Sequence, residues 1–273
     1  MRKHTIFGIE QKAPAAFLAL SVAVLANGLA HAKEPYSASP RADVTNLMPK
    51  AVSLMRRGDY WREHGEIEKA LDLYNKAIEA DARAADAYFN RARVWEEFGK
   101  MDKALKDLDT AIKLRKPFHE GALRNRGDLY QSLRQFENAI RDYSTIIKEA
   151  PTDGLYINRA TCYLRINKPE IALRDFNQAL KICGPRPILL EKRGDAYVIL
   201  KQDAKALADY DMTLKLDPEG DQSRDGHEHL HRSRAEIYKR MGKTDLYKKE
   251  LAAAAKGRNA NMDIAPFSSY PMK

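Results

Sequence analysis

The stretch Asn125-Arg126-Gly127-Asp128-Leu129-Tyr130 decides the fold, because its pattern occurs in six copies along a chain of 273 residues. In each copy an arginine precedes a small residue, Gly or Ala, and an aromatic residue follows three positions later. Successive small residues lie 34, 35, 33, 34 and 41 residues apart, a period that indicates stacked supersecondary repeats. The other copies are Arg56-Arg57-Gly58-Asp59-Tyr60-Trp61, Asn90-Arg91-Ala92-Arg93-Val94-Trp95, Asn158-Arg159-Ala160-Thr161-Cys162-Tyr163, Lys192-Arg193-Gly194-Asp195-Ala196-Tyr197 and Ser233-Arg234-Ala235-Glu236-Ile237-Tyr238.

Two further columns keep the same phase. An alanine follows in five copies, and a bulky residue comes four positions after it. Small residues let two helices approach closely, while bulky residues fill the space to the neighbouring pair. The alanines are Ala70, Ala104, Ala139, Ala172 and Ala206, with Tyr247 in the sixth copy, and the bulky residues are Tyr74, Leu108, Tyr143, Phe176, Tyr210 and Leu251.

These columns resemble the tetratricopeptide repeat (TPR) family from about Ala51 to Gly257. The resemblance implies an all-α fold, an α-solenoid of about six helical hairpins forming a right-handed superhelix. It also implies a protein that binds another protein or a peptide and has no catalytic residues, metal or cofactor. The expected repeats lie near residues 51–84, 85–119, 120–152, 153–186, 187–220 and 228–257.

The first 32 residues follow a different pattern, which is typical of a bacterial secretory signal. Basic residues precede an apolar run over residues 15–25, and Ala30-His31-Ala32 offers a cleavage site. The alternative is an uncleaved anchor, but the run is shorter than the ~20 residues of a membrane-spanning helix. We therefore expect export, to the periplasm or outside the cell, after cleavage near Ala32. Residues 33–50 are expected to be a flexible lead-in and residues 258–273 an irregular tail.

Composition agrees with a helical, moderately basic protein. Charged residues make up 31% of the chain, against only 14 Gly and 12 Pro, and the formal net charge is +9. Lys and Arg that solvate outer helical faces explain this charge. The alternative is weak attraction to anionic envelope surfaces or to acidic partners.

By resemblance, the first helix of each repeat lines a concave groove with its second, fifth, sixth, ninth, twelfth and thirteenth residues. The sixth-position row consists of hydrogen-bond donors, and the ninth-position row is mostly carboxylate. Such rows suit an extended polypeptide, whose backbone offers both carbonyls and amides. The alternative is that Asn-Arg-Ala and Asn-Arg-Gly are common structural variants of the repeat. The residues expected to contact a partner are Arg56, Asn90, Arg93, Arg124, Asn125, Asn158 and Lys192.

The charges at these positions disfavour nucleic acid as a partner. Nine basic and nine acidic residues occupy them, so the lining is formally neutral and offers no basic surface for base stacking. The arginine row has a structural interpretation instead. Its aliphatic stems are expected to pack between helices while the guanidinium groups reach a carboxylate or a helix end. The sequence leaves the oligomeric state open, including a self-associating solenoid.

One segment, His227-Glu228-His229-Leu230-His231, matches the H-E-x-x-H pattern of zinc peptidases. A metal-dependent enzyme or a metal-binding protein is therefore the alternative function. Against it, Arg234 stands where the extended pattern has glycine, and His231 falls in a column of inward-packing residues. Ordinary packing is the favoured interpretation.

The two cysteines are expected to remain free thiols. Cys162 falls in the middle of the first helix of its repeat, and Cys183 falls at the end of the second helix. An offset of about eight residues separates them by roughly 12 Å along the axis, whereas a disulfide needs Cα atoms within about 7 Å. Cys162 is expected to be buried.

Overall fold

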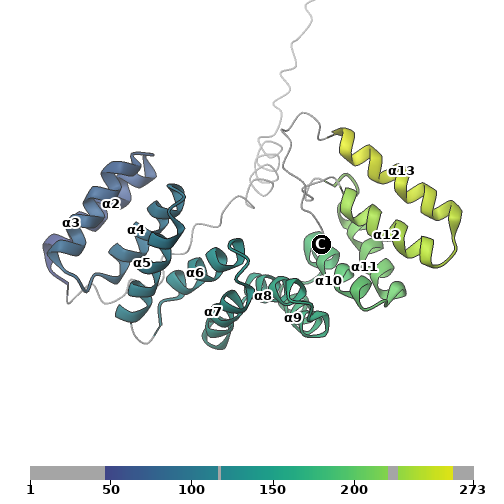
Figure 1. The fold of residues 1–273 in the computed structure, drawn as a ribbon, viewed down its shortest axis with the longest axis horizontal. Coiled ribbons are helices and arrows are strands. Elements are labelled where there is room, and N and C mark those ends of the chain that lie inside the picture. Colours follow the sequence, from purple (N-terminus) through teal and green to yellow (C-terminus); the bar gives the residue numbers. More distant parts are fainter. Residues whose placement is uncertain (1–46, 116–117, 221–226, 261–273) are drawn as a thin grey trace, which may run out of the picture. The chain divides into compact units, whose positions relative to one another are not determined.

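The computed structural model describes residues 47–115, 118–220 and 227–260. In these ranges every regular element is an α-helix (Figure 1). The expected signal over residues 1–32 lies outside them, as does most of the expected tail. No helix of the described ranges is long and apolar enough to span a membrane. The helices are α2 (Pro49–Glu63), α3 (Ile67–Ala80), α4 (Ala85–Glu97), α5 (Met101–Leu114), α6 (Glu120–Ser132), α7 (Phe136–Glu149), α8 (Asp153–Arg165), α9 (Pro169–Cys183), α10 (Pro187–Ile199), α11 (Asp203–Leu216), α12 (Glu228–Arg240) and α13 (Thr244–Ala260).

The helices pair in chain order into six hairpins, from α2 with α3 to α12 with α13. Each hairpin then packs on the next one, for example through α3 against α4 and α7 against α8. This arrangement confirms the predicted α-solenoid of TPR hairpins. Two boundaries differ from the prediction. Helix α2 already begins at Pro49, since proline suits a first helical position, and α13 continues to Ala260 through the alanine run over residues 252–255.

Short turns connect the two helices of each hairpin. Gly65, Gly99 and Gly242 adopt φ of 77°, 67° and 69°, the left-handed region that glycine enters at little cost. Pro169 begins α9, because proline suits the first position of a helix. The neighbouring Asn167 has a φ of 56°, so asparagine takes the glycine role there.

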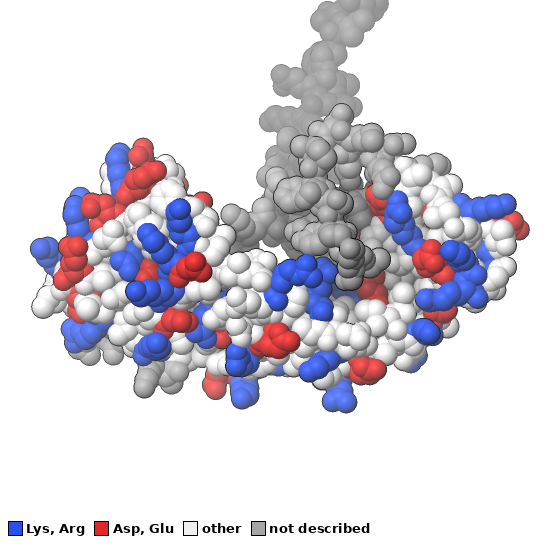
Figure 2. All heavy atoms as spheres, viewed as in Figure 1, with Lys and Arg blue, Asp and Glu red and all other residues white. Residues whose placement is uncertain are grey.

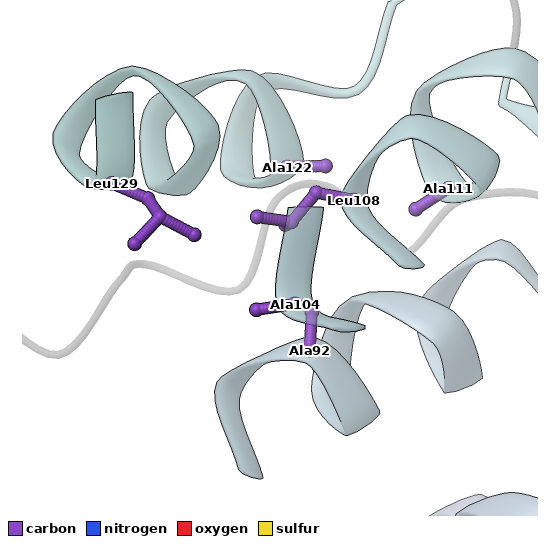
Figure 3. Close-up of a cluster of buried hydrophobic side chains, with 6 residues drawn as sticks. All are labelled: Ala92, Ala104, Leu108, Ala111, Ala122 and Leu129. Atoms are coloured by element: carbon purple, nitrogen blue, oxygen red, sulfur yellow. The ribbon is translucent and has the colours of Figure 1, made fainter. Parts of the chain in front are cut away.

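Small and bulky residues meet inside and between the hairpins. Figure 3 shows one such cluster, where α4, α5 and α6 come together. The alanines let the helix backbones approach, and the two leucines fill the remaining space, so these columns form the core that the sequence predicts. The cluster consists of Ala92, Ala104, Leu108, Ala111, Ala122 and Leu129.

The first, third and fifth hairpins share a second contact, in which a tyrosine ring of the second helix packs directly against a glycine of the first helix. A Cβ atom on Gly127 would lie only 2.8 Å from the Tyr143 ring, so this position tolerates no side chain unless the ring moves. The Tyr143 hydroxyl donates a hydrogen bond of 2.7 Å to Asp128, the residue after the glycine. The same contacts join Gly58, Tyr74 and Asp59, and Gly194, Tyr210 and Asp195.

The arginine row holds neighbouring hairpins together. Arg126 on α6 donates through Nε and Nη2 to Asp142 on α7, at 2.8 and 2.6 Å, and through Nη1 to Asp109 on the preceding α5, at 2.6 Å. This confirms the expected structural role and adds a partner in the previous hairpin. We call these residues the bridging arginines. They are Arg91 (with Asp107 and Asn75), Arg126 (Asp142 and Asp109), Arg159 (Asp175 and Ser144), Arg193 (Asp209 and Asn177) and Arg234 (Glu250 and Asp211).

The packing columns change character at both ends of the six hairpins. At the start, Arg57 occupies the bridging position but is exposed, and Leu73 stands where the interior hairpins have a buried aspartate. At the end, a charged Lys248 and a small Ala255 are exposed in columns that hold Leu or Ile in every other hairpin. Leu251 is consequently 40% exposed, whereas its counterparts are fully buried. Outer faces that are more polar than the interior columns are typical of capping repeats.

Loss of one bridging arginine should destabilise the solenoid. In Arg126→Met, Asp142 would remain buried without its cation, which costs about 2 to 4 kcal/mol of unfolding free energy. Urea unfolding followed by circular dichroism measures the change. The matched control is Arg57→Met, which removes an exposed arginine and should shift stability by less than about 0.5 kcal/mol. Equal effects of the two substitutions would contradict the assigned role, as would no effect of Arg126→Met.

Candidate peptide-binding face

The seven residues predicted to contact a partner lie on consecutive first helices. Arg56 lies on α2, Asn90 and Arg93 on α4, Arg124 and Asn125 on α6, Asn158 on α8 and Lys192 on α10. We call the expected lining positions of α2, α4, α6, α8, α10 and α12 the first-helix face. Arg56 is exposed and Asn125 is buried, while the other five side chains are half-buried.

Two of the asparagines already bind neighbouring hairpins. The Asn90 amide donates a hydrogen bond of 2.8 Å to Oδ1 of Asp59, which also accepts from Tyr74. Asn158 donates in the same way to Asp128, at 3.4 Å. The donor row and the carboxylate row are therefore partly paired with each other. An alignment of the repeats does not reveal this pairing, because each hydrogen bond joins a residue of one repeat to a residue of the next.

Asn125 has a different environment, because the preceding hairpin has Arg93 in place of an aspartate. Its side chain is only 7% exposed. In the fifth hairpin Asp195 accepts from Tyr210 and has Nε2 of His229, on α12, at 3.1 Å. A carboxylate bound across the junction thus occurs in alternate hairpins, which the spacing of Gly-Asp in the sequence could have indicated.

The cations of the face differ in how they are held. Arg124 forms an ion pair of 2.7 Å with Glu120, one turn earlier on α6. The Arg93 guanidinium lies 5.9 Å from the centre of the Phe89 ring, within cation–π range. Lys192 forms no ion pair with a described residue, and neither does Arg56. Of the four cations among the seven predicted residues, Arg56 and Lys192 are therefore the most available to a ligand.

Glu96 on α4 is a candidate that the seven residues did not include. Its Oε1 is buried and has no hydrogen-bond partner among the described residues. The pKa of this carboxyl group is raised to about 7, mainly by burial. The negative charges of Asp128 and Glu97 also raise this pKa, whereas the positive charge of Arg93 lowers it. The sequence places Glu96 at a lining position, but its desolvation depends on the folded chain. Within the described part of the chain it is an acceptor without a donor.

The character of the face changes along the chain. Over α8 and α10 several lining positions are apolar, including Ile157, Leu164 and Val198. Ile188 and Ile199, three turns apart on α10, are 51% and 46% exposed. No atom lies within 4 Å of the position that a Cβ on Gly154 would take, so the start of α8 is open. The face is therefore polar over α2 to α6 and more apolar over α8 and α10.

The histidine segment has structural partners. His227, which is buried, has its Nε2 2.6 Å from the backbone carbonyl oxygen of Asp217. His231 has its Nδ1 2.7 Å from Oε2 of Glu250 on α13, and Glu250 also binds Arg234. Within the described ranges no group of three or more His, Cys, Asp or Glu residues could hold a metal ion. The segment anchors the start of α12 and joins it to α13.

The two cysteines lie apart from these contacts in different environments. Neither forms a disulfide, and Cys162 is buried as predicted. Its Sγ lies 3.4 Å from the side-chain oxygen of Gln131, and burial raises its pKa to about 12. Cys162 is therefore a packing residue with little thiolate character.

Sequence comparison places the repeats in a known family. Residues 55–117 and 99–154 match the tetratricopeptide repeat family model. The DnaJ homolog subfamily C member 7 homolog of Schizosaccharomyces pombe is 28% identical over 183 residues, which cover 64% of this chain and 33% of that protein. Human serine/threonine-protein phosphatase 5 is 31% identical over 120 residues, covering 44% of this chain and 23% of that protein. The chain thus spans a third or less of these relatives.

Solved structures show the same fold. YrrB, described as a TPR protein with an unusual peptide-binding site, has a TM-score of 0.57 at 17% identity, over 69% of this chain and 94% of its own. PilF of Pseudomonas aeruginosa has a TM-score of 0.60 at 16% identity, over 79% of this chain and 93% of its own. Residues 55–154 are thus identified as tetratricopeptide repeats, and the stacked hairpins as a whole have the fold of the solved TPR structures.

Proposed function

We propose that this protein is an interaction scaffold of the bacterial cell envelope that binds an extended segment of another protein on its first-helix face. One observation carries the proposal. Consecutive first helices present the same positions hairpin after hairpin, and one of these positions holds a buried carboxylate oxygen that has no donor among the residues the structure describes. A repeating row of side chains suits a ligand that is itself a linear repeat of backbone groups. The peptide-binding site named for YrrB gives a precedent in the same fold.

Glu96 supplies the chemical argument for a ligand. A buried acceptor without a partner destabilises the free protein, because the oxygen has lost water and gained no hydrogen bond. A donor from a bound segment, either a backbone amide or a basic side chain, would restore that bond. Arg93 and Asp128 lie close enough to influence its charge, so the donor would enter a mixed ionic environment. We place the polar end of the ligand here.

The apolar part of the face sets the other requirement on the ligand. Ile188 and Ile199 leave about half of their side-chain surface exposed, and Ile157 and Val198 lie at neighbouring lining positions. Covering these side chains would remove apolar surface from water, which favours binding. The proposed ligand therefore has donors that reach α4 and apolar side chains that reach α8 and α10.

The two alternative functions have less support. The metal-dependent function needs His227 and His231 at one centre, but they contact different groups, the Asp217 carbonyl and the Glu250 carboxylate. Head-to-tail stacking would bury Lys248 against the end that carries Arg57, which costs desolvation and like-charge repulsion. Neither alternative is proposed.

The proposed location depends on the residue pattern of the first 32 positions. A secreted or periplasmic protein cleaved near Ala32 should begin at or close to Lys33. N-terminal sequencing of the protein purified from its native compartment tests this. Recovery of an intact N-terminus from the membrane fraction would favour the uncleaved anchor.

Replacing Glu96 by Gln should stabilise the free protein at high pH. The folded state holds the Glu96 proton up to a pKa of about 7, above the ordinary value of 4.5. The contribution of Glu96 to stability is therefore fully present below about pH 4.5 and is lost as pH rises toward 7, because the unfolded chain ionises more easily. Glu96→Gln should raise the urea midpoint at pH 8 and leave it nearly unchanged at pH 4. The control is the exposed neighbour Glu97→Gln. Equal shifts for both variants at pH 8 would show that Glu96 is not the group responsible.

The binding face can be located by photo-crosslinking in the native compartment. A photoreactive residue at Arg56 or Lys192, both on the first-helix face, should capture the same protein partner. The control position is Glu79, which is exposed on α3 away from that face. Excess unlabelled protein should suppress capture, whereas excess Glu96→Gln protein should suppress it less. Capture from Glu79 alone would place the binding surface elsewhere.

A further inference from the structure

The second helices carry a repeated pair of cations. On α5, α7 and α9, one basic residue lies in mid-helix and another lies seven residues later. A separation of seven residues is nearly two turns, so both side chains project from the same side of the helix, about 10 Å apart. We call this set the outer stripe. It consists of Lys106 and Lys113 on α5, Arg141 and Lys148 on α7, and Arg174 and Lys181 on α9.

These six side chains are exposed and lack an ionic partner. None forms an ion pair with a described residue, and only Arg141 has a side-chain hydrogen bond, to Asn138. Acidic residues stand one turn before the mid-helix cations, at Asp102, Glu137 and Glu170, yet no pair forms. Elsewhere this spacing does give pairs, as between Lys76 and Asp72. The bridging arginines, by contrast, all bind carboxylates.

The stripe has limits within the solenoid. At the two equivalent positions α3 has Asp72 and Glu79, and α11 has Ala208 and Lys215. A cation near a helix C-terminus is favoured by the helix dipole, which explains the last-turn lysines of α5, α7 and α9. The dipole does not explain the three mid-helix cations. The pattern is thus continuous over three consecutive hairpins, is interrupted at α11, and recurs in the sequence of α13 at Lys249 and Lys256.

The surroundings of the stripe favour an acidic polypeptide over other polyanions. Between the paired cations lie Thr110, Thr145 and Gln178, which are polar and carry no aromatic ring for stacking on nucleic-acid bases. These positions also offer no apolar side chain for insertion into a lipid surface, and the exposed large apolar side chains on α5, α7 and α9 are limited to Leu114, Ile171 and Ile182. A spacing of about 10 Å matches three residues of an extended chain. In Figure 2, Lys and Arg side chains project along the margin where α7 and α9 lie in Figure 1.

We propose that the outer stripe binds an acidic segment of a protein partner, with carboxylates about three residues apart engaging the cations of α5, α7 and α9. This surface belongs to the second helices, so the inference is independent of ligand binding on the first-helix face. It assigns part of the basic excess of the chain to a specific surface. Binding through exposed charges weakens as salt screens them.

The test is binding of a fluorescent 16-residue Glu/Ser peptide with glutamate at every third position, followed by anisotropy at low ionic strength. The stripe variant replaces all six cations by Gln, and affinity should fall roughly tenfold, since each exposed pair contributes little. The matched control removes the same charge from six exposed cations elsewhere and should lose less than about twofold. The control changes are Lys50→Gln, Lys100→Gln, Arg134→Gln, Lys168→Gln, Lys201→Gln and Lys243→Gln.

Equal losses in both variants would overturn the proposal, because they would show attraction to net charge alone. Stripe-dependent binding to vesicles of anionic phospholipid or to single-stranded DNA that exceeds binding to the peptide would overturn the choice of partner. Circular dichroism and urea midpoints must match the native protein for both variants. If the sixfold variant unfolds, the double variant Lys113→Gln with Lys148→Gln replaces it, compared with Lys168→Gln with Lys201→Gln. The outcome does not depend on whether Arg56 or Lys192 captures a ligand.

Discussion

The bridging arginine is the interaction on which the rest of the solenoid depends. Its aspartate partners on the second helices are nearly inaccessible, with Asp142 only 4% exposed, and a buried carboxylate is stable only with a cation and full hydrogen bonding. The bidentate contact fixes the distance between the two helices of one hairpin, and the remaining guanidinium nitrogen reaches the hairpin before it. One side chain therefore sets both the closure of a repeat and its register on the stack.

The hairpins could be predicted from the sequence because their packing is local and periodic. Gly127 and Ala139 recur in phase in the other copies, so their close helix contacts could be inferred without coordinates. The partner of Arg126 in the previous hairpin could not be predicted, since Asp109 lies in a different repeat and contacts the guanidinium only when the hairpins are stacked. The alternation of Gly-Asp with Ala was visible in the sequence. The physical reason for this alternation is the contact of the Tyr143 ring with Gly127, which is seen only in the folded chain.

The candidate site was predicted less completely, for the same reason. The lining positions could be assigned from the repeat phase together with the resemblance to the TPR family, but the state of each polar atom depends on the neighbouring hairpin. Asn90 was predicted to contact a partner, and in the folded chain its amide donates to Asp59 across the junction. The sequence does not distinguish Glu96 from the other acidic lining residues, because nothing local shows that its Oε1 becomes buried. Desolvation of a side chain depends on how the hairpins stack, so it cannot be predicted from the sequence of a single repeat.

Stacking also limits which residues can recognise a ligand, because it uses polar atoms in contacts between hairpins. Some junctions use more of these atoms than others. The junctions after the first, third and fifth hairpins have an aspartate contact in addition to the bridging arginine, through Asn90, Asn158 and His229. The junction between α5 and α6 has Arg93 at the corresponding position and uses Arg126 with Asp109 instead. Polar groups bound in this way stabilise the scaffold and have little left to offer a ligand. Recognition must then be carried by groups that are not used in stacking contacts. Among the described residues these include the buried oxygen of Glu96, the cations Arg56 and Lys192, the exposed isoleucines of α10 and the outward cations of the second helices.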